Sequence, residues 1–242
     1  MKLLVFQHIA CEHPGALRYY LAEDGVEWDA VQLDDGGTIP ELANYDALWV
    51  MGGPMDVWDV VEHPWLIEEK KAIRGWVTEL RRPFLGLCLG HQLLADALGG
   101  TCGPARPPEI GILEVSMTDA AADDPVFGGL PQTQKCLQWH SVEVAQPPEN
   151  TTILASSPDC RIQAMRVGEC AWSAQYHVEL EADTISNWGA VPDYAAALEQ
   201  SMGAGALDAI NRKASENMAE FANVSRSLYS NFMQVVRSRG LS

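Results

Sequence analysis

The segment 84–87 contains no polar side chain and lies between two stretches with a helical pattern. Upstream, over residues 64–81, apolar residues recur near a period of 3.6 with Glu and Lys between them. Downstream, a second helix is expected over 91–98. A short strand without polar residues that is flanked by helices is typical of a parallel sheet covered on both faces.

The rest of the chain falls into two parts with different patterns. In the first part short apolar runs alternate with an amphipathic stretch, which predicts strands at 2–6, 28–33 and 47–51 and a helix at 13–23. In the second part strand-like segments follow one another with turns between them, at 111–117, 137–144, 152–156, 162–166 and 171–176. Beyond residue 180 the pattern is helical again. We therefore expect an α/β fold with a mostly parallel central sheet flanked by helices, an antiparallel extension and a C-terminal helical tail.

Length and charge narrow the organisation and the partners. The 242 residues suit a main domain over 1–185 and a helical extension over 186–242 that packs on the same domain. With 33 acidic against 16 basic residues the formal net charge is −17, so no nucleic acid and no anionic membrane is expected as a partner. The first apolar run is too short for a signal peptide or a membrane span, which indicates a cytoplasmic protein.

His8, Cys11 and His13 are close enough in sequence to suggest a metal cluster. No second group of ligands follows at a usable spacing, and the six cysteines include no C-x-x-C pair. We therefore expect no metal, and reduced thiols that mostly serve as small core residues.

The sequence Gly86-Leu87-Cys88-Leu89-Gly90 lies at the expected junction between a strand and a helix. Glycines two positions before and after a nucleophile let the chain turn tightly and lift the side chain off the sheet. At the start of a helix, unpaired N–H groups and the macrodipole favour a thiolate. Cys88 is therefore the candidate nucleophile, and a buried structural cysteine is the alternative.

A cysteine nucleophile needs a base, and the base needs a partner that orients it. His177 and Glu179 supply both at the end of a predicted strand. Alternate residues of an extended chain share one face, so both side chains can face Cys88 while Val178 points away.

Gly52-Gly53-Pro54 directly follows another predicted strand. Ligands of such sheets bind at the carboxyl ends of the strands, where Cys88 is also expected. The Gly53 amide could join the amide of Leu89 in holding a developing oxyanion. An ordinary strand-ending turn explains the glycines equally well.

These residues together resemble the class I (triad) glutamine amidotransferases, and most closely the stand-alone members similar to the glutaminase domain of GMP synthase. The resemblance covers roughly residues 1–185 in the family's order and spacing. It rests on Met51-Gly52-Gly53-Pro54, on Gly86 to Gln92 continuing into Leu93-Leu94-Ala95, on Trp139-His140-Ser141, and on Gln175-Tyr176-His177-Val178-Glu179.

The resemblance implies a flavodoxin-like sheet and hydrolysis of the glutamine side-chain amide, without a metal or organic cofactor. It implies that Cys88 is the nucleophile, that His177 is the base and then the acid, and that Glu179 orients His177. The oxyanion-hole amides would belong to Gly53 and Leu89. Gln92 would help to hold the substrate, which is L-glutamine or another γ-glutamyl compound.

Two positions depart from the family pattern. Val178 stands where the family usually has proline between its His and Glu, and little chemical consequence is expected because this side chain points away from the thiol. Ser141-Val142 follows Trp-His where stand-alone relatives often carry Gly-Asp, which puts the substrate preference in doubt more than the catalysis. The resemblance assigns no role to the helical tail.

Three functional interpretations remain open. The chain is an amidotransferase subunit that feeds a separate synthetase subunit, or a self-contained hydrolase of γ-glutamyl amides or peptides, or a non-catalytic interaction protein on the same fold. No nucleotide-binding loop of the G-x-x-x-x-G-K-[ST] type occurs, so the ammonia acceptor is not evident. The complete set of Cys, His and Glu weakens the third interpretation.

Overall fold

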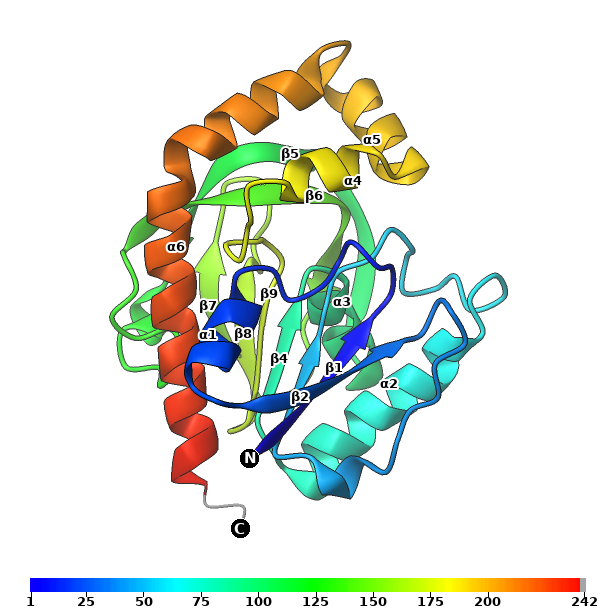
Figure 1. Cartoon of the computed structure of the whole chain (residues 1–242), viewed down its shortest axis with the longest axis vertical. Coiled ribbons are helices and arrows are strands. Elements are labelled where there is room, and N and C mark those ends of the chain that lie inside the picture. Colours follow the sequence, from blue (N-terminus) through cyan, green and yellow to red (C-terminus); the bar gives the residue numbers. More distant parts are fainter. Residues whose placement is uncertain (240–242) are drawn as a thin grey trace.

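A computed structural model describes residues 1–239 and shows one nine-stranded sheet with helices on both faces (Figure 1). The strand order is β2-β1-β3-β4-β9-β8-β7-β5-β6. The first five strands in this order run parallel to one another, and the remaining neighbours pair antiparallel. The order of the parallel part is that of flavodoxin-like sheets, so the expected fold class is confirmed.

The parallel strands are β1 (Lys2–Gln7), β2 (Glu27–Gln32), β3 (Ala47–Val50), β4 (Phe84–Leu87) and β9 (Ala171–Ala174). The antiparallel strands are β5 (Thr101–Met117), β6 (Thr133–Gln146), β7 (Thr151–Ser156) and β8 (Ala164–Val167). The helices are α1 (Leu17–Glu23), α2 (Trp65–Gly75), α3 (Leu89–Ala97), α4 (Thr184–Gly189), α5 (Pro192–Met202) and α6 (Ala206–Ser238).

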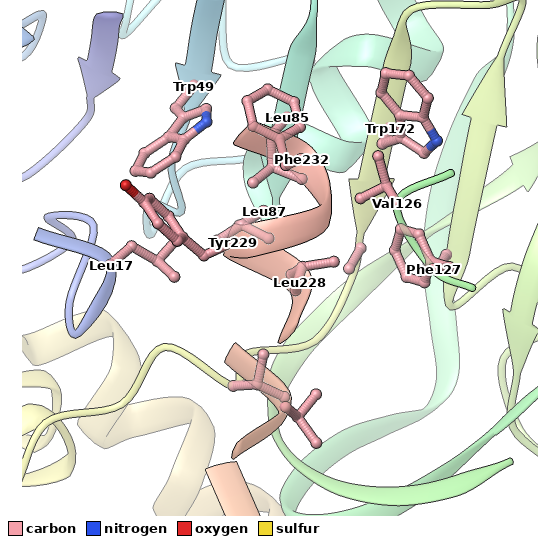
Figure 2. Packing of buried hydrophobic residues seen from close by; sticks show 14 of the residues in the cluster. Leu17, Trp49, Leu85, Leu87, Val126, Phe127, Trp172, Leu228, Tyr229 and Phe232 are labelled. Carbon is pink, nitrogen blue, oxygen red and sulfur yellow. The ribbon is translucent and has the colours of Figure 1, made fainter. Parts of the chain in front are cut away.

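Each face of the parallel sheet has its own hydrophobic core. One core joins α1 and the C-terminal half of α6 to the sheet, and Figure 2 shows Tyr229 and Phe232 of α6 beside Trp49 of β3. The other core joins α2 and α3 to the opposite face. Because both faces are covered, the central strands β3 and β4 are buried along their whole length, as their lack of polar residues predicts.

The antiparallel extension begins earlier than expected. Strand β5 starts at Thr101, whereas the sequence pattern predicts a strand only from residue 111. Pro104, Pro107 and Pro108 interrupt the pattern there. This half of β5 pairs only with β6, with an irregularity between Pro104 and Glu109, so the missing N–H groups break no second ladder.

Helix ends also differ from the expected ranges. Helix α3 begins at Leu89, directly after Cys88, and not at residue 91. Helix α1 begins at Leu17, because residues 14–16 form a turn before it. Helix α2 continues as a π-helical turn over Trp76–Leu80, and Arg81 ends it in a left-handed conformation with φ 52°.

The helical tail packs on the rest of the chain through two of the cores. Its last helix, α6, runs the length of the molecule (Figure 1). The N-terminal half of α6 joins α4, α5, β5 and β6 in a third core that contains Trp139, Trp188, Tyr194 and Phe221. Residues 240–242 of the expected tail lie outside the described residues.

Candidate active site

Cys88 lies between the end of β4 and the first residue of α3. A side chain on Gly86 would put its Cβ 2.5 Å from the carbonyl oxygen of Gly90, and one on Gly90 would put its Cβ 2.1 Å from the carbonyl oxygen of Val50. Neither position has room for a Cβ, so both glycines are needed for the close approach of helix and strand. The expected tight turn is therefore present.

The backbone of Cys88 is strained. It has φ 51° and ψ −104°, a combination that side-chain-bearing residues rarely adopt. Its N–H donates to the carbonyl of Ala174 at 2.8 Å, and its carbonyl accepts from the N–H groups of His91 and Gln92. Such strain persists only where the surroundings fix it, and it is frequent at functional sites.

His177 follows β9, and its backbone exchanges two hydrogen bonds of 2.9 Å with Leu137 of β6. Its ring nitrogen Nδ1 lies 2.6 Å from Oε1 of Glu179. The second carboxylate oxygen of Glu179 accepts the N–H of Val178 at 2.9 Å. Among residues 1–239, no hydrogen-bond partner is found for Nε2 of His177. That nitrogen is free for a reacting group.

The imidazole is surrounded by groups that favour its protonated form. Burial lowers the pKa of His177, but the Glu179 carboxylate and the sulfur of Cys88 outweigh burial and raise that pKa well above its usual value. Burial raises the pKa of Glu179, whereas His177 and two backbone contacts bring it below the usual range. The geometry is that of a thiol next to an imidazolium–carboxylate pair.

The two amides expected to form an oxyanion hole both line the cavity that contains Cys88. The amide of Leu89 belongs to the first turn of α3, where no helical acceptor exists. In the described part of the chain, neither the Gly53 amide nor the Leu89 amide donates a hydrogen bond. Both are therefore available to an oxygen bound in the cavity.

Gln92 also lines this cavity and is buried. Its Nε2 donates to the carbonyl of Val142 and to Oε1 of Gln175, at 3.1 Å in both cases. Gln175 in turn places its Nε2 3.7 Å from the sulfur of Cys88. The amide nitrogen of Gln92 is thus held by the protein, and a role in substrate binding stays a prediction.

The cavity has a volume of about 90 Å³. Trp139, His140 and Ser141 line it, as expected for a segment near the substrate. Behind them, Nε2 of His140 lies 3.1 Å from Oε2 of Glu109, a buried carboxylate that also accepts hydrogen bonds from Ser157 and Gln163. The pKa of Glu109 is raised by burial and brought below its usual value by His140 and these donors.

The tail contributes to the cavity, which sequence reasoning missed. Asp193, Tyr194 and Ala197 of α5 line it. The hydroxyl of Tyr194 donates to Oε1 of the buried Glu12 at 2.5 Å. Burial is the main cause that raises the pKa of Glu12. No local pattern marks Tyr194, because it reaches Glu12 only through the fold.

His8, Cys11 and His13 do not converge. Nδ1 of His13 accepts the N–H of Gly15, and its Nε2 lies 3.6 Å from Glu181. His8 points instead toward Glu69 and the Gly52 carbonyl. Glu69 is a further buried group that the sequence did not single out, since an acidic residue in an amphipathic helix is ordinarily exposed.

No helix within residues 1–239 is both long enough and apolar enough to cross a membrane.

Comparisons with known proteins fit this site and fold. The family model described as glutamine amidotransferase class-I matches residues 14–186. The glutamine-hydrolyzing subunit of GMP synthase from Sulfolobus acidocaldarius is 32% identical over 154 residues, which are 63% of this chain and 77% of the relative. Gamma-glutamyl peptidase 3 of Arabidopsis thaliana is 26% identical over 172 residues, 67% of each chain.

The fold has close counterparts among solved structures. A glutamine amidotransferase from Thermotoga maritima superposes with a TM-score of 0.84 at 24% identity, over 96% of this chain and 97% of that one. The superposition extends beyond residues 14–186 and so includes helices of the tail. With the family model matching most of its length, the chain belongs to the class I glutamine amidotransferase family.

Proposed function

We propose that the chain hydrolyses the side-chain amide of glutamine through a γ-glutamyl thioester on Cys88 and releases glutamate and ammonia. The observation that carries this proposal is the buried series Glu179–His177–Cys88, in which Nε2 of the imidazole is free on the side of the thiol. Membership of a family with glutamine-hydrolysing relatives supports it.

In the acylation step the thiolate of Cys88 forms a bond to the amide carbon, and the carbonyl π electrons move onto oxygen. The N–H groups of Gly53 and Leu89 hold this oxyanion. When the carbonyl re-forms, the C–N bond breaks, and His177 gives its Nε2 proton to the departing nitrogen, which leaves as ammonia. Glu179 keeps the ring oriented and stabilises its charged form.

Deacylation reverses the proton transfer. The now neutral His177 removes a proton from water, and the water oxygen attacks the thioester carbon. The C–S bond breaks, glutamate leaves, and the thiolate–imidazolium pair is restored. Gln92, at the wall of the cavity, is proposed to hold the substrate through its side-chain oxygen, because its nitrogen is engaged elsewhere.

A second candidate is hydrolysis of γ-glutamyl amides or peptides by the chain alone. One observation favours it: the cavity is closed by the chain's own helix α5, so no other protein is needed to complete the wall. The likeness to a gamma-glutamyl peptidase supports it too. The chemistry is the same, except that the leaving group is an amine and not ammonia.

A partnership with a separate synthetase subunit is a proposal that rests on the GMP synthase relatives, whose names mark them as one part of that enzyme. In that case the ammonia is consumed by the partner. We further propose that residues 1–185 carry the catalytic groups and that the extension from 186 completes the same unit through Tyr194 and Trp188. A reducing, cytoplasmic location suits an enzyme with six unpaired cysteines.

The test is to incubate the purified chain with L-glutamine and a panel of γ-glutamyl amides and peptides, following glutamate, ammonia and free amine. Cys88→Ala removes the nucleophile, and Cys170→Ala is the matched control, since Cys170 is buried at the start of β9 outside the cavity. Turnover that is lost only in Cys88→Ala supports the thiol mechanism. The best substrate then separates a glutaminase from a γ-glutamyl hydrolase.

An intact-mass measurement after treatment with an electrophilic glutamine analogue runs beside it. Labelling at Cys88 without turnover would point to a protein that needs its synthetase. Neither labelling nor turnover in folded protein would reject the catalytic proposal in favour of an interaction protein.

A further inference from the structure

The turn after β3 contains a peptide unit whose two ends face different surroundings. The carbonyl oxygen of Gly52 lies 2.8 Å from Nδ1 of His8. The amide nitrogen of Gly53 belongs to the same peptide unit, which is trans. In a trans peptide the C=O and N–H bonds point in opposite directions. With its oxygen directed at His8, the unit directs its N–H away from His8.

Gly53 lines the cavity together with Cys88 and Leu89. The N–H that points away from His8 has no acceptor in the described part of the chain. Rotation of this one peptide by half a turn would present the carbonyl oxygen where the N–H now is. An oxyanion would then meet a partial negative charge in place of a donor, so the orientation of the peptide decides whether the hole exists.

His8 is itself firmly held. The side chains of His8 and of Glu69 in α2 both have 0% of their surface exposed, and Nε2 of His8 lies 2.8 Å from Oε1 of Glu69. The His8 ring stacks on Trp65, with centroids 5.6 Å apart and planes 16° from parallel. Contacts on both nitrogens and on one ring face leave the imidazole one orientation.

The hydrogen-bond roles of His8 follow from its partners. A carbonyl oxygen only accepts, so Nδ1 must carry a proton to bind Gly52. Nε2 faces a carboxyl group, which can be met either as N–H to a carboxylate or as a lone pair to a carboxylic acid. Burial lowers the pKa of His8, but the Glu69 charge and the two hydrogen bonds outweigh it and raise the pKa. The imidazolium–carboxylate form is thereby favoured, and Nδ1 is a donor in either case.

The glycine turn fits tightly between its neighbours. A Cβ on Gly53 would lie 2.8 Å from Cβ of His8, and a Cβ on Gly52 would lie 2.6 Å from Oε2 of Glu12. Glu12 approaches from the side of Tyr194, whereas His8 approaches from the side of α2. The peptide is therefore gripped by a charged or polar side chain on each side.

We propose that His8, anchored by Glu69, is a positioning residue that fixes the Gly52–Gly53 peptide so that the Gly53 N–H faces the reacting carbonyl. The proposal deepens the proposed function and rests on it for its kinetic consequences. His8 touches no substrate; it acts only through the peptide that it holds. Its signature is a loss of transition-state stabilisation that leaves the Cys88–His177 pair unaffected.

Two substitutions of His8 separate its two contacts. The side-chain amide of Asn puts an N–H near the place of Nδ1, so His8→Asn can keep the donor to Gly52 but not the contact with Glu69. The longer His8→Gln puts its amide near the place of Nε2 and reaches Glu69 but not Gly52. Glu69→Gln keeps a neutral His8 with Nδ1 protonated, and Glu68→Gln, on the exposed face of the same helix, is the matched control.

The expected kinetic result is a fall in kcat of about 10²–10³-fold for His8→Gln with little change in KM, as for loss of one oxyanion donor. His8→Asn and Glu69→Gln should stay within about tenfold of wild type, and Glu68→Gln should equal it. Alkylation of Cys88 by iodoacetamide develops no oxyanion, so its rate should be the same in all of these variants. Equal losses in His8→Gln and His8→Asn, or an alkylation rate that falls with kcat, would overturn the proposal.

Crystal structures of the same variants give a readout without activity. The Gly52–Gly53 peptide is expected to be rotated in His8→Gln and unchanged in His8→Asn and Glu69→Gln. An unchanged peptide in His8→Gln would reject the positioning role even if the wild-type enzyme is active. If the wild type has no turnover, the proposed function fails, while the crystal structures still decide whether His8 sets the peptide. Should His8→Gln not fold, Glu69→Leu removes the anchor from the other side and is expected to lower kcat well below that of Glu69→Gln.

Discussion

The indole of Trp188 lies edge-on against the imidazole of His177, with ring centroids 4.7 Å apart and planes at 74°. Trp188 belongs to α4, so the tail reaches the residue proposed as the general base. Its Nε1 donates to the carbonyl of Cys11 at 3.3 Å, which fixes the indole against the loop after β1. The tail thus excludes water from the ring that must transfer a proton.

Replacing Trp188 by Ala should therefore affect both stability and activity. A buried Trp→Ala change costs about 3–5 kcal/mol of unfolding free energy. Loss of the packing that orients His177 should lower kcat on the order of 10²-fold, because small misplacements of catalytic groups have effects of that size. Urea unfolding and glutamine or γ-glutamyl turnover measure the two effects. The same change at Trp58, which is 45% exposed, should alter neither; a similar loss there would remove the argument for a special role of Trp188.

The glycine turn offers a second prediction. A methyl group on Gly53 would lie 2.8 Å from His8 Cβ and from the sulfur of Met55, so Gly53→Ala must move the turn. We expect kcat to fall by about 10²–10³-fold with a smaller change in KM, since the donor is lost mainly to the transition state. Unaltered kcat in a folded Gly53→Ala protein would show that this amide does not serve the reaction.

Gly75→Ala is the matched control for that change. Gly75 is the last residue of α2, and a Cβ there meets no atom within 4 Å. An alanine in a helix should stabilise the protein by about 0.5–1 kcal/mol relative to glycine. Thermal unfolding should show a higher Tm, and turnover should not change.

The sequence could predict the elbow and the His–Glu pair because each depends on local geometry. Gly86 and Gly90 mark a turn wherever they stand around a nucleophile, and alternation along a strand end puts His177 and Glu179 on one side. The same reasoning could not find Tyr194 or Glu69, because their contacts join residues that are far apart in the sequence. The early half of β5 was missed because prolines are tolerated there only through its position at one side of the sheet.

The expected division into 1–185 and 186–242 leads to a prediction about folding. Helix α6 supplies Tyr229, Phe232 and Met233 to the core under β3 and β4, and Figure 2 shows two of these side chains against Trp49. Removing residues 186–242 would expose that whole face of the sheet. We expect the fragment 1–185 to be insoluble or to lack cooperative unfolding by circular dichroism, whereas Phe232→Ala in the full chain should cost about 3–5 kcal/mol and remain folded. A fragment that unfolds cooperatively would establish the first 185 residues as an independent domain.

The charge state of His177 predicts how stability depends on pH. Its pKa is raised in the folded protein above the ordinary value of 6.5, chiefly by Glu179 and Cys88 against the opposing effect of burial. A group whose pKa is raised on folding contributes stability that is complete below its unfolded pKa and is lost as the pH rises through its folded pKa. The stability of wild type relative to His177→Gln should therefore be largest below about pH 6.5 and should decrease as the pH is raised. Urea unfolding of both proteins at a series of pH values from 6 to 10 measures this difference, and His63→Gln, at a partly exposed position, controls for the substitution itself. A difference that grows with pH would mean that His177 is buried neutral, and the thiolate–imidazolium mechanism would then lack its proton donor.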